Sequence, residues 1–116
     1  MILGTGIDII EIERIQKAVE RWGEAFLNHI FTPVEIKAAS KYKFPYQHYA
    51  GRFAAKEAIF KAVGNPKLGW HDITITNDAE GKPICHYNNP DFKNRILISI
   101  SHGKDHAVAS AVVEAK

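Results

Sequence analysis

The chain has 116 residues, of which 46% are hydrophobic and 24% charged, a composition typical of soluble globular proteins and not of disordered or membrane-embedded ones. Its formal net charge of +2 is too small to indicate bulk nucleic-acid binding. The single cysteine, Cys85, excludes an internal disulfide and a cysteine-cluster zinc site, and favours a reducing, cytosolic compartment. We therefore expect one domain over residues 1–116, with any substrate site in a surface groove or between subunits.

The N-terminal segment predicts a strand followed by an amphipathic helix. Residues 2–10 form a short apolar run that contains Gly4 and Gly6, which predicts a buried strand that another segment approaches closely. Because the run is short and contains Asp8, it predicts neither a signal peptide nor a membrane span. Residues 11–22 change to helical period. The expected core face carries Ile12, Ile15, Val19 and Trp22, and the basic outer face carries Arg14, Lys17 and Arg21.

The middle of the chain predicts three further helices. Residues 26–30 form a short one, and residues 32–42 form another, which opens with a capping box between Thr32 and Glu35. Residues 42–49 are aromatic, contain a proline and predict a connection. The alanine-rich segment 50–64 predicts a long helix, for which Gly64 followed by Asn65-Pro66 is the stop signal.

Two charged pairs stand out on this long helix. Glu57 and Lys61 lie one turn apart on the same face, and Arg52 and Lys56 form a second stripe. The first pair fits two interpretations. It is either an ion pair on a solvated face, or an acid and a base placed to hold a metal ion and a phosphate together.

The second half of the chain predicts antiparallel strands. Alternating or β-branched runs over residues 72–76, 84–87, 95–101 and 106–113 are separated by turn residues. The fold class is therefore α+β, with an N-terminal strand and helices followed by antiparallel strands, and we expect the N-terminal strand to join their sheet.

Two short polar segments are open to both structural and functional interpretation. Asp8 among isoleucines either needs a functional reason to be near the core or caps the first helix through a capping box with Glu11. The segment 101–104, Ser-His-Gly-Lys, is either a phosphate or ribose site at a strand end or a plain hairpin. His102 and His106 flank that turn, so their spacing does not favour a metal pair. Gly4-Thr5-Gly6 lacks the third glycine of a dinucleotide-binding fingerprint.

Taken together, several motifs resemble one family in order and spacing. They are Gly6-Ile7-Asp8-Ile9, Phe31-Thr32 with Glu35, the segment 51–58 with Lys61-Ala62 and Gly64, Gly81-Lys82-Pro83, and Ile98-Ser99-Ile100-Ser101-His102. In these motifs the chain is similar to the holo-acyl carrier protein synthases, from about Ile2 to Val113. Its length matches the small bacterial type and not the double-length phosphopantetheinyl transferases. Gly103 departs from the pattern, because a hydroxyl residue is expected after the Ser-His pair.

The resemblance implies a 4′-phosphopantetheinyl transferase-like fold and transfer of 4′-phosphopantetheine from coenzyme A to a serine of apo acyl carrier protein. The released product is adenosine 3′,5′-bisphosphate. It further implies that Asp8 and Glu57 bind Mg²⁺, that Lys61 contacts the pyrophosphate, and that Arg52, Ser101 and His102 contact the nucleotide and its 3′-phosphate. A homotrimer with sites at subunit boundaries is also implied.

Other points stay open on the sequence alone. The base that removes the serine proton is a metal-bound water, Glu57 or Lys61. Two other functions compete with the transferase: a non-enzymatic module that binds an acidic protein or a nucleotide through its basic helix face, and a Mg²⁺-dependent nucleotide phosphohydrolase. The acidic carrier protein would dock on Arg14, Lys17 and Arg21. No nucleic-acid or membrane partner is expected.

Overall fold

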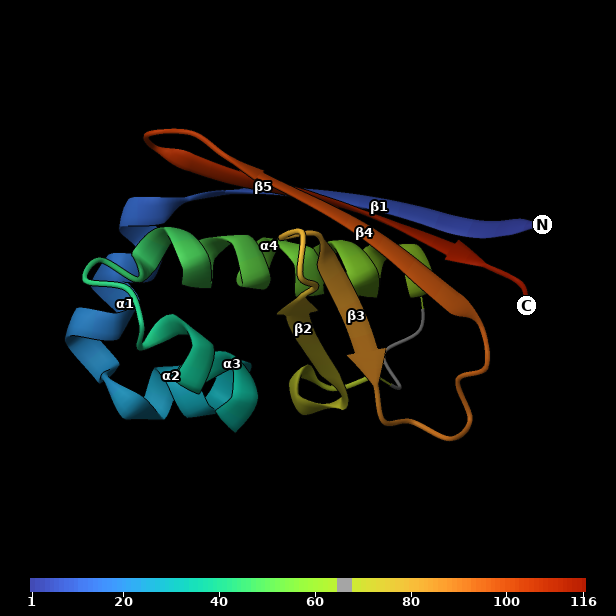
Figure 1. Ribbon diagram of the computed structural model, residues 1–116, viewed down its shortest axis with the longest axis horizontal. Coiled ribbons are helices and arrows are strands. Elements are labelled where there is room, and N and C mark those ends of the chain that lie inside the picture. The colour runs from blue at the N-terminus through green and yellow to red at the C-terminus, as the bar shows by residue number, and fades with distance from the viewer. Residues whose placement is uncertain (65–67) are drawn as a thin grey trace.

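The computed structural model describes residues 1–64 and 68–116 and has the predicted α+β order of elements (Figure 1). Helices fill the first half after one strand, and strands fill the second half. The elements are β1 (Ile2–Glu11), α1 (Ile12–Trp22), α2 (Glu24–Ile30), α3 (Pro33–Ala39), α4 (Tyr46–Val63), a 3₁₀ turn η1 (Trp70–Asp72), β2 (Ile73–Asn77), β3 (Pro83–Tyr87), β4 (Arg95–His102) and β5 (His106–Glu114).

The N-terminal strand joins the C-terminal strands, as expected. The main sheet has the order β1-β5-β4, and both pairings are antiparallel. Asp8 lies opposite Ala109 in β5, and Ser101 of β4 lies opposite Val108. A second sheet consists of β2 and β3 alone.

Helix α4 lies along one face of the main sheet, and it is the close neighbour that the glycines of β1 accommodate (Figure 1). A Cβ atom added to Gly4 would stand 2.0 Å from the carbonyl oxygen of Ala62, and one added to Gly6 would stand 2.0 Å from that of Ala58. The facing side chains of α4 are small and buried, among them Ala54, Ala55 and Ala58. The glycines therefore let the helix backbone approach the strand, which places α4 side chains beside Asp8.

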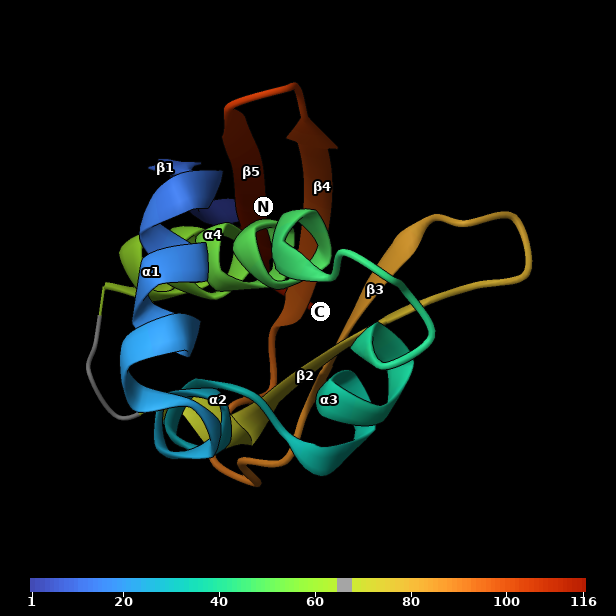
Figure 2. The ribbon, with the colours of Figure 1, turned by 90° about the vertical axis from the view of Figure 1, so that its left-hand side faces the viewer.

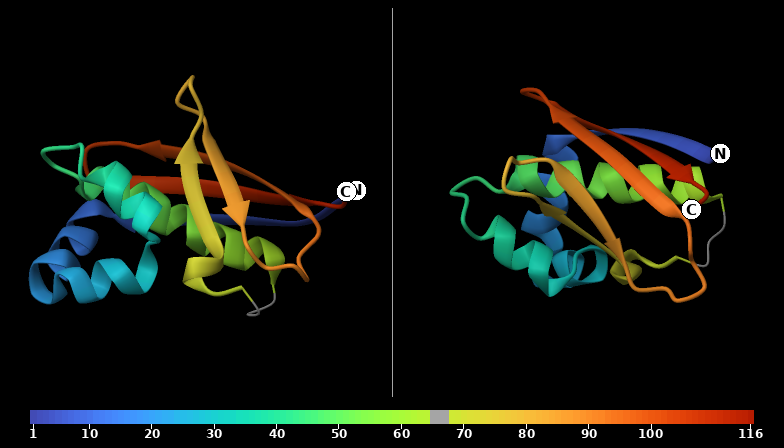
Figure 3. Two further views of the ribbon diagram at one scale, coloured as in Figure 1. Left: turned by 60° about the horizontal axis from the view of Figure 1, so that its bottom comes forward. Right: turned by 45° about the vertical axis from the view of Figure 1, so that its right-hand side comes forward.

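The other elements cover the far side of α4. In Figure 2, where α4 runs obliquely across the view, β4 and β5 rise above it, α1 lies on one side, and α2 and α3 lie below. The β2–β3 hairpin crosses beside α4 and projects away from the helices (Figure 3). The core thus has α4 at its centre. None of the helices in the described ranges is both long and apolar enough to cross a membrane.

The prediction of a buried first strand is confirmed for one face of the strand and wrong for the other. Even-numbered residues of β1 point toward α4, whereas Ile7 and Ile9 on the opposite face are 64% and 63% exposed. Leu3 and Leu97 extend the same exposed apolar surface across the sheet. An antiparallel sheet commonly packs one face on the core, and in this chain the other face is also apolar.

Several predicted helix boundaries are confirmed or shifted. The capping box of α3 is present: the Thr32 amide donates to Glu35 Oε1 and the Glu35 amide donates to Thr32 Oγ1. Helix α3 ends at Ala39 instead of residue 42. At this end the Ser40 hydroxyl donates a hydrogen bond to the Lys37 carbonyl. Helix α4 begins at Tyr46, inside the predicted connection, because Pro45 at its N-cap has no N–H with which to continue a helix backward, while its carbonyl accepts from the Tyr49 amide at 2.9 Å.

The far end of α4 also agrees with the prediction as far as it is described. Gly64 caps α4 at a φ of 72°, a left-handed conformation that favours glycine. The rest of the predicted stop signal, Asn65-Pro66, lies outside the described residues.

Candidate active site

Asp8, Glu57 and Lys61 come together where β1 crosses α4. The pleat of β1 points Asp8 toward the helix, and Lys61 reaches back to the strand. Its ammonium donates to the backbone carbonyl of Ile7 at 3.0 Å and to Asp8 Oδ1 at 3.1 Å. The Asp8 side chain is 16% exposed and that of Lys61 54% exposed, so the cluster lies at the surface end of the strand–helix contact.

The two carboxylates are close enough to influence one another. The pKa of Glu57 is raised, first by burial and second by the negative charge of Asp8, while Lys61 acts in the opposite direction. A hard divalent cation between two such carboxylates would relieve that repulsion, and Mg²⁺ typically takes one or two carboxylates and completes its octahedron with water and substrate oxygens. The donor set therefore fits Mg²⁺. No group of three or more His, Cys, Asp or Glu side chains within the described ranges is arranged to hold a metal.

Two structural interpretations of these residues are wrong. Lys61 pairs with Asp8 across the strand–helix contact, so the predicted ion pair with Glu57 along a solvated face does not describe it. Asp8 does not cap the first helix, because it lies inside β1 and the N-cap of α1 is Glu11, which makes no side-chain capping bond.

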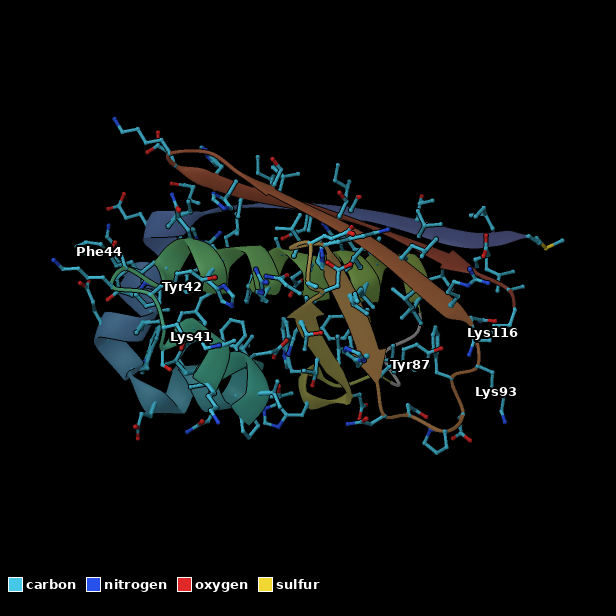
Figure 4. The ribbon with its side chains drawn as sticks, in the orientation of Figure 1. Lys41, Tyr42, Phe44, Tyr87, Lys93 and Lys116 are labelled. Carbon is cyan, nitrogen blue, oxygen red and sulfur yellow. The ribbon has the colours of Figure 1, made fainter. Side chains whose placement is uncertain are left out.

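Arg52 and His102 line a second site, a pocket of about 350 Å³ between α4, the β2–β3 hairpin and β4. Its wall combines aromatic, amide and cationic groups, contributed by Tyr42, Phe44, Gln47, His48, Arg52, Asn77, Gly81, Pro83, Ile100 and His102. Figure 4 shows Tyr42 and Phe44 in the loop between α3 and α4, beside Lys41. Aromatic surface next to cations suits a nucleotide, whose base stacks and whose phosphates are anionic.

Arg52 is the buried cation of this pocket. The residue is 8% exposed, and its Nη2 donates to Asn77 Oδ1 at 2.8 Å. Its Nε has no hydrogen-bond partner within the described part of the chain. The neighbouring His48 is held neutral near pH 7, because burial and then the Arg52 charge lower its pKa to about 4. A positive group of this kind, with an unused donor, favours an anionic ligand.

Ser101 does not line this pocket with His102. The two residues are neighbours in β4, where side chains alternate between faces. Ser101 is exposed on the same face as Leu97 and Ser99, which is the apolar outer face of the sheet. Its role in nucleotide binding stays a prediction.

The two clusters lie on different sides of α4. Arg52 and Glu57 are five residues apart, so they project about 140° apart around the helix at about 100° per residue. The residues that line the Arg52 pocket include none of Asp8, Glu57 and Lys61. One chain therefore carries two polar clusters that face different directions.

The basic face of α1 is exposed, and its charges are not equivalent. Lys17 forms an exposed ion pair with Glu13 at 2.9 Å, whereas Arg21 lies over the ring of Trp22 at 4.8 Å. Trp22 itself is 55% exposed, so the prediction that it faces the core is wrong. It is the last residue of α1, where Gly23 at a φ of 56° turns the chain away.

A buried ion pair that sequence reasoning missed fixes the elements around Arg52. Lys56 is 0% exposed, and its ammonium donates to Glu35 Oε1 at 2.7 Å and to the carbonyls of Ile30 and Trp70 at 2.9 and 3.0 Å. Glu35 Oε2 accepts from the backbone amide of Ile75 in β2 at 2.8 Å. Burial lowers the pKa of Lys56, and Glu35 opposes that shift. The sequence feature that could have indicated this burial is the position of Lys56 next to Ala54 and Ala55, the small buried residues with which α4 packs.

Comparison with known proteins agrees with this geometry. The family model of the 4′-phosphopantetheinyl transferase superfamily matches residues 4–111, which include the residues of both clusters. The chain belongs to this superfamily. The family resemblance and the fold class predicted from the sequence are confirmed, and the protein is an enzyme of the phosphopantetheinyl transferase type.

Relatives in the superfamily cover nearly the whole chain. Holo-[acyl-carrier-protein] synthase of Chlorobaculum parvum is 46% identical over 112 residues, which are 94% of this chain and 96% of that protein. The synthase of Thermodesulfovibrio yellowstonii is 44% identical over 114 residues, 97% of this chain and 99% of that one.

Solved structures agree as closely. A holo-(acyl-carrier-protein) synthase from Bacillus anthracis, crystallised in complex with CoA (3′,5′-ADP), matches with a TM-score of 0.89 and 40% identity over 100% of this chain and 99% of that one. The Helicobacter pylori synthase in complex with coenzyme A matches with a TM-score of 0.86 and 34% identity over 95% and 99%.

Proposed function

We propose that this transferase moves the 4′-phosphopantetheine group of coenzyme A to a serine of apo acyl carrier protein, and that it depends on Mg²⁺. The observation that carries the proposal is that one chain holds two complementary half-sites. Two carboxylates beside Lys61 suit a metal-bound pyrophosphate, and the Arg52 pocket suits a nucleotide with a further phosphate. The names of its relatives, and the coenzyme A bound in two of their structures, support the same substrates.

In the proposed reaction the serine oxygen attacks the phosphorus next to the pantetheine arm. The serine hydroxyl gives its proton to a base, the bond from that phosphorus to the bridging oxygen breaks, and adenosine 3′,5′-bisphosphate leaves with the bond's electron pair. Asp8 and Glu57 would hold Mg²⁺, which supplies charge neutralisation at the pyrophosphate. Lys61 donates two hydrogen bonds at the same place, which suits a cation that stabilises the charge of the leaving oxygens rather than a base.

Incubation with coenzyme A, Mg²⁺ and apo acyl carrier protein tests this function. The expected result is a carrier whose intact mass has increased by one phosphopantetheine group. Free pantetheine phosphate without modified carrier would instead indicate a phosphohydrolase. No reaction, with coenzyme A or carrier still bound, would indicate a binding module.

We also propose a homotrimer in which each active site lies at a subunit boundary. The outer face of the main sheet exposes Ile7, Ile9 and Leu97, and an apolar surface of this kind marks an interaction site. The two half-sites face different directions on one chain, so a neighbour would bring its Arg52 pocket to Asp8 and Glu57.

We propose the reducing cytosol as the compartment of this protein. Its lone cysteine, Cys85, is unpaired in the described part of the chain, and burial raises the pKa of its thiol to about 12.

Mixing two inactive variants should restore activity if the site is shared. Asp8→Asn inactivates the half-site proposed to hold Mg²⁺. Arg52→Met inactivates the half-site proposed to bind the nucleotide, provided that the coenzyme A concentration is well below half-saturation. In randomly mixed trimers about one quarter of the sites receive both intact halves, since each half is intact in about half of the subunits. Coexpressed variants should therefore show about one quarter of the wild-type rate. A mixture no more active than its components would place the whole site within one subunit.

The carrier protein is proposed to dock on the basic face of α1. Arg14 and Arg21 are exposed there, and an acidic partner is attracted to such a surface. Lys17 contributes less than the two arginines, because Glu13 already neutralises it.

Reversing both arginines should weaken carrier docking specifically. Arg14→Glu with Arg21→Glu should raise the carrier concentration for half-maximal rate about tenfold or more, with an unchanged requirement for coenzyme A. Added salt should weaken carrier binding to wild type more than to this variant. The charge-matched control reverses Lys93 and Lys116, which lie at the opposite end of the molecule from the α3–α4 loop (Figure 4). If the control variant raised the carrier requirement as much as the arginine variant does, the basic face of α1 would be an ordinary solvated surface and not the docking site.

A further inference from the structure

The guanidinium of Arg52 has a neutral partner where a buried arginine ordinarily has an acid. Within the described ranges Arg52 forms no ion pair, and its one side-chain hydrogen bond goes to the amide oxygen of Asn77 at 2.8 Å. His48 on the same wall is neutral near pH 7. Buried charges are normally paired because an unpaired charge is costly to remove from water. Glu35 attracts Arg52 only through space and is itself paired with Lys56. Asn77 therefore orients the Arg52 side chain, and no acid bonds directly to it.

Asn77 is itself held in place by the buried pair behind it. It is the last residue of β2, and two residues earlier the Ile75 amide donates to Glu35 Oε2 at 2.8 Å. Glu35 also accepts from Lys56, which lies one helical turn after Arg52 on α4. Two parallel links thus join α4 to β2, one through Glu35 and one through Asn77. The first fixes the separation of helix and strand, and the second fixes the direction of the Arg52 side chain.

We propose that Asn77 is a positioning residue that aims Arg52 at a phosphate anion in the pocket and, being an amide, leaves the arginine charge available to it. This inference rests on the proposed function, in which the pocket takes the 3′-phosphate of coenzyme A. An aspartate has nearly the same shape and would accept the same hydrogen bond. It would also neutralise Arg52, so it would stabilise the apoprotein and compete with the phosphate.

The test compares binding of adenosine 3′,5′-bisphosphate with that of adenosine 5′-monophosphate, which lacks the 3′-phosphate. Calorimetry on the intact protein with Mg²⁺ measures both affinities, and thermal unfolding measures stability. Asn77→Ala should weaken bisphosphate binding about threefold to tenfold and leave monophosphate binding within about twofold. Asn77→Asp should weaken bisphosphate binding more than tenfold while the melting temperature stays equal to or above that of wild type.

Two further variants separate positioning from general effects. Asn88→Asp carries the same charge change in the loop after β3, does not line the pocket, and should bind both nucleotides like wild type. In an Arg52→Met background, Asn77→Ala should add less than twofold, because Asn77 acts through Arg52. If Asn77→Asp bound the bisphosphate as tightly as wild type, or if Asn77→Ala had its full effect without Arg52, the inference would be overturned.

The same data distinguish the inference from the function beneath it. If wild type prefers the bisphosphate and Arg52→Met removes that preference, the phosphate role of Arg52 stands whatever Asn77 does. If neither wild type nor Arg52→Met distinguishes the two nucleotides, the phosphate role fails and the inference fails with it.

Discussion

Asp8→Ala and Glu57→Ala are each expected to remove most transferase activity while the protein stays folded. Each variant takes away one of the two carboxylates proposed to hold Mg²⁺. Substitution of residues that merely support metal ligands already costs about 10–100-fold in metal affinity or activity, so loss of a ligand should cost more than about 100-fold. Packing should suffer little, because the Asp8 side chain is 16% exposed and its ion-pair partner Lys61 is 54% exposed.

Rates over a range of Mg²⁺ concentrations, together with direct binding of Mn²⁺ as a spectroscopic substitute, measure this effect. Glu24→Ala removes an exposed carboxylate of α2, which contributes no residue to the cluster, and serves as the control. Lys61→Met tests the alternative hypothesis that the only role of Asp8 is to hold Lys61 in place. In that case Lys61→Met would reproduce the rate loss of Asp8→Ala, and Mn²⁺ binding would be unchanged in both. Near-wild-type rates in either carboxylate variant at moderate Mg²⁺ would refute the metal assignment.

Lys56→Met should cause a large loss of stability. All three N–H groups of the ammonium have acceptors, and removing it leaves the Glu35 carboxylate buried without its counter-ion. Breaking a buried ion pair from one side typically costs about 3–5 kcal/mol in free energy of unfolding. Urea denaturation measures this difference, and for a chain of this size such a loss is a large part of the total stability.

The chain offers a matched control for this substitution. Lys17→Met also removes a lysine from an ion pair with a glutamate, but the side chains of Lys17 and Glu13 are 71% and 68% exposed. Its expected cost is below about 1 kcal/mol. The double variant Glu35→Gln with Lys56→Met should recover part of the loss, because glutamine is uncharged and still offers one acceptor. If the two lysine variants were equally stable, the buried pair would contribute nothing beyond an exposed one.

Features set by near neighbours in the sequence were predicted well. The capping box of Thr32 and Glu35 follows from a spacing of three residues, and both of its hydrogen bonds are present. The strand pattern of the second half follows from alternation, and Gly4 and Gly6 correctly indicated a close approach to the first strand.

Contacts between distant residues were not predictable by the same rules. Helix spacing favoured an ion pair between Lys61 and Glu57, but the Lys61 ammonium donates to Asp8, which lies 53 residues away in sequence. The capping box accounts for one oxygen of Glu35, whereas the other accepts from Ile75, 40 residues further on. Periodicity within one helix carries no information about which strand will cross it. The exposure of Ile7 and Ile9 was missed for a related reason, since an apolar run does not say what covers its second face.

The pairing of β1 with β5 has a consequence for how activity appears as the chain folds. It brings Ile2 opposite Glu114 and Asp8 opposite Ala109, so residues about one hundred positions apart must meet before these hydrogen bonds form. Such non-local pairing is slow compared with the formation of a helix or a hairpin. An intermediate with α4 and the β4–β5 hairpin formed, but with β1 still undocked, would contain Glu57 and Lys61 without Asp8 beside them. Recovery of catalysis during refolding therefore requires this long-range pairing and then the proposed assembly of subunits, whereas the far-ultraviolet signal of the helices reports the local steps.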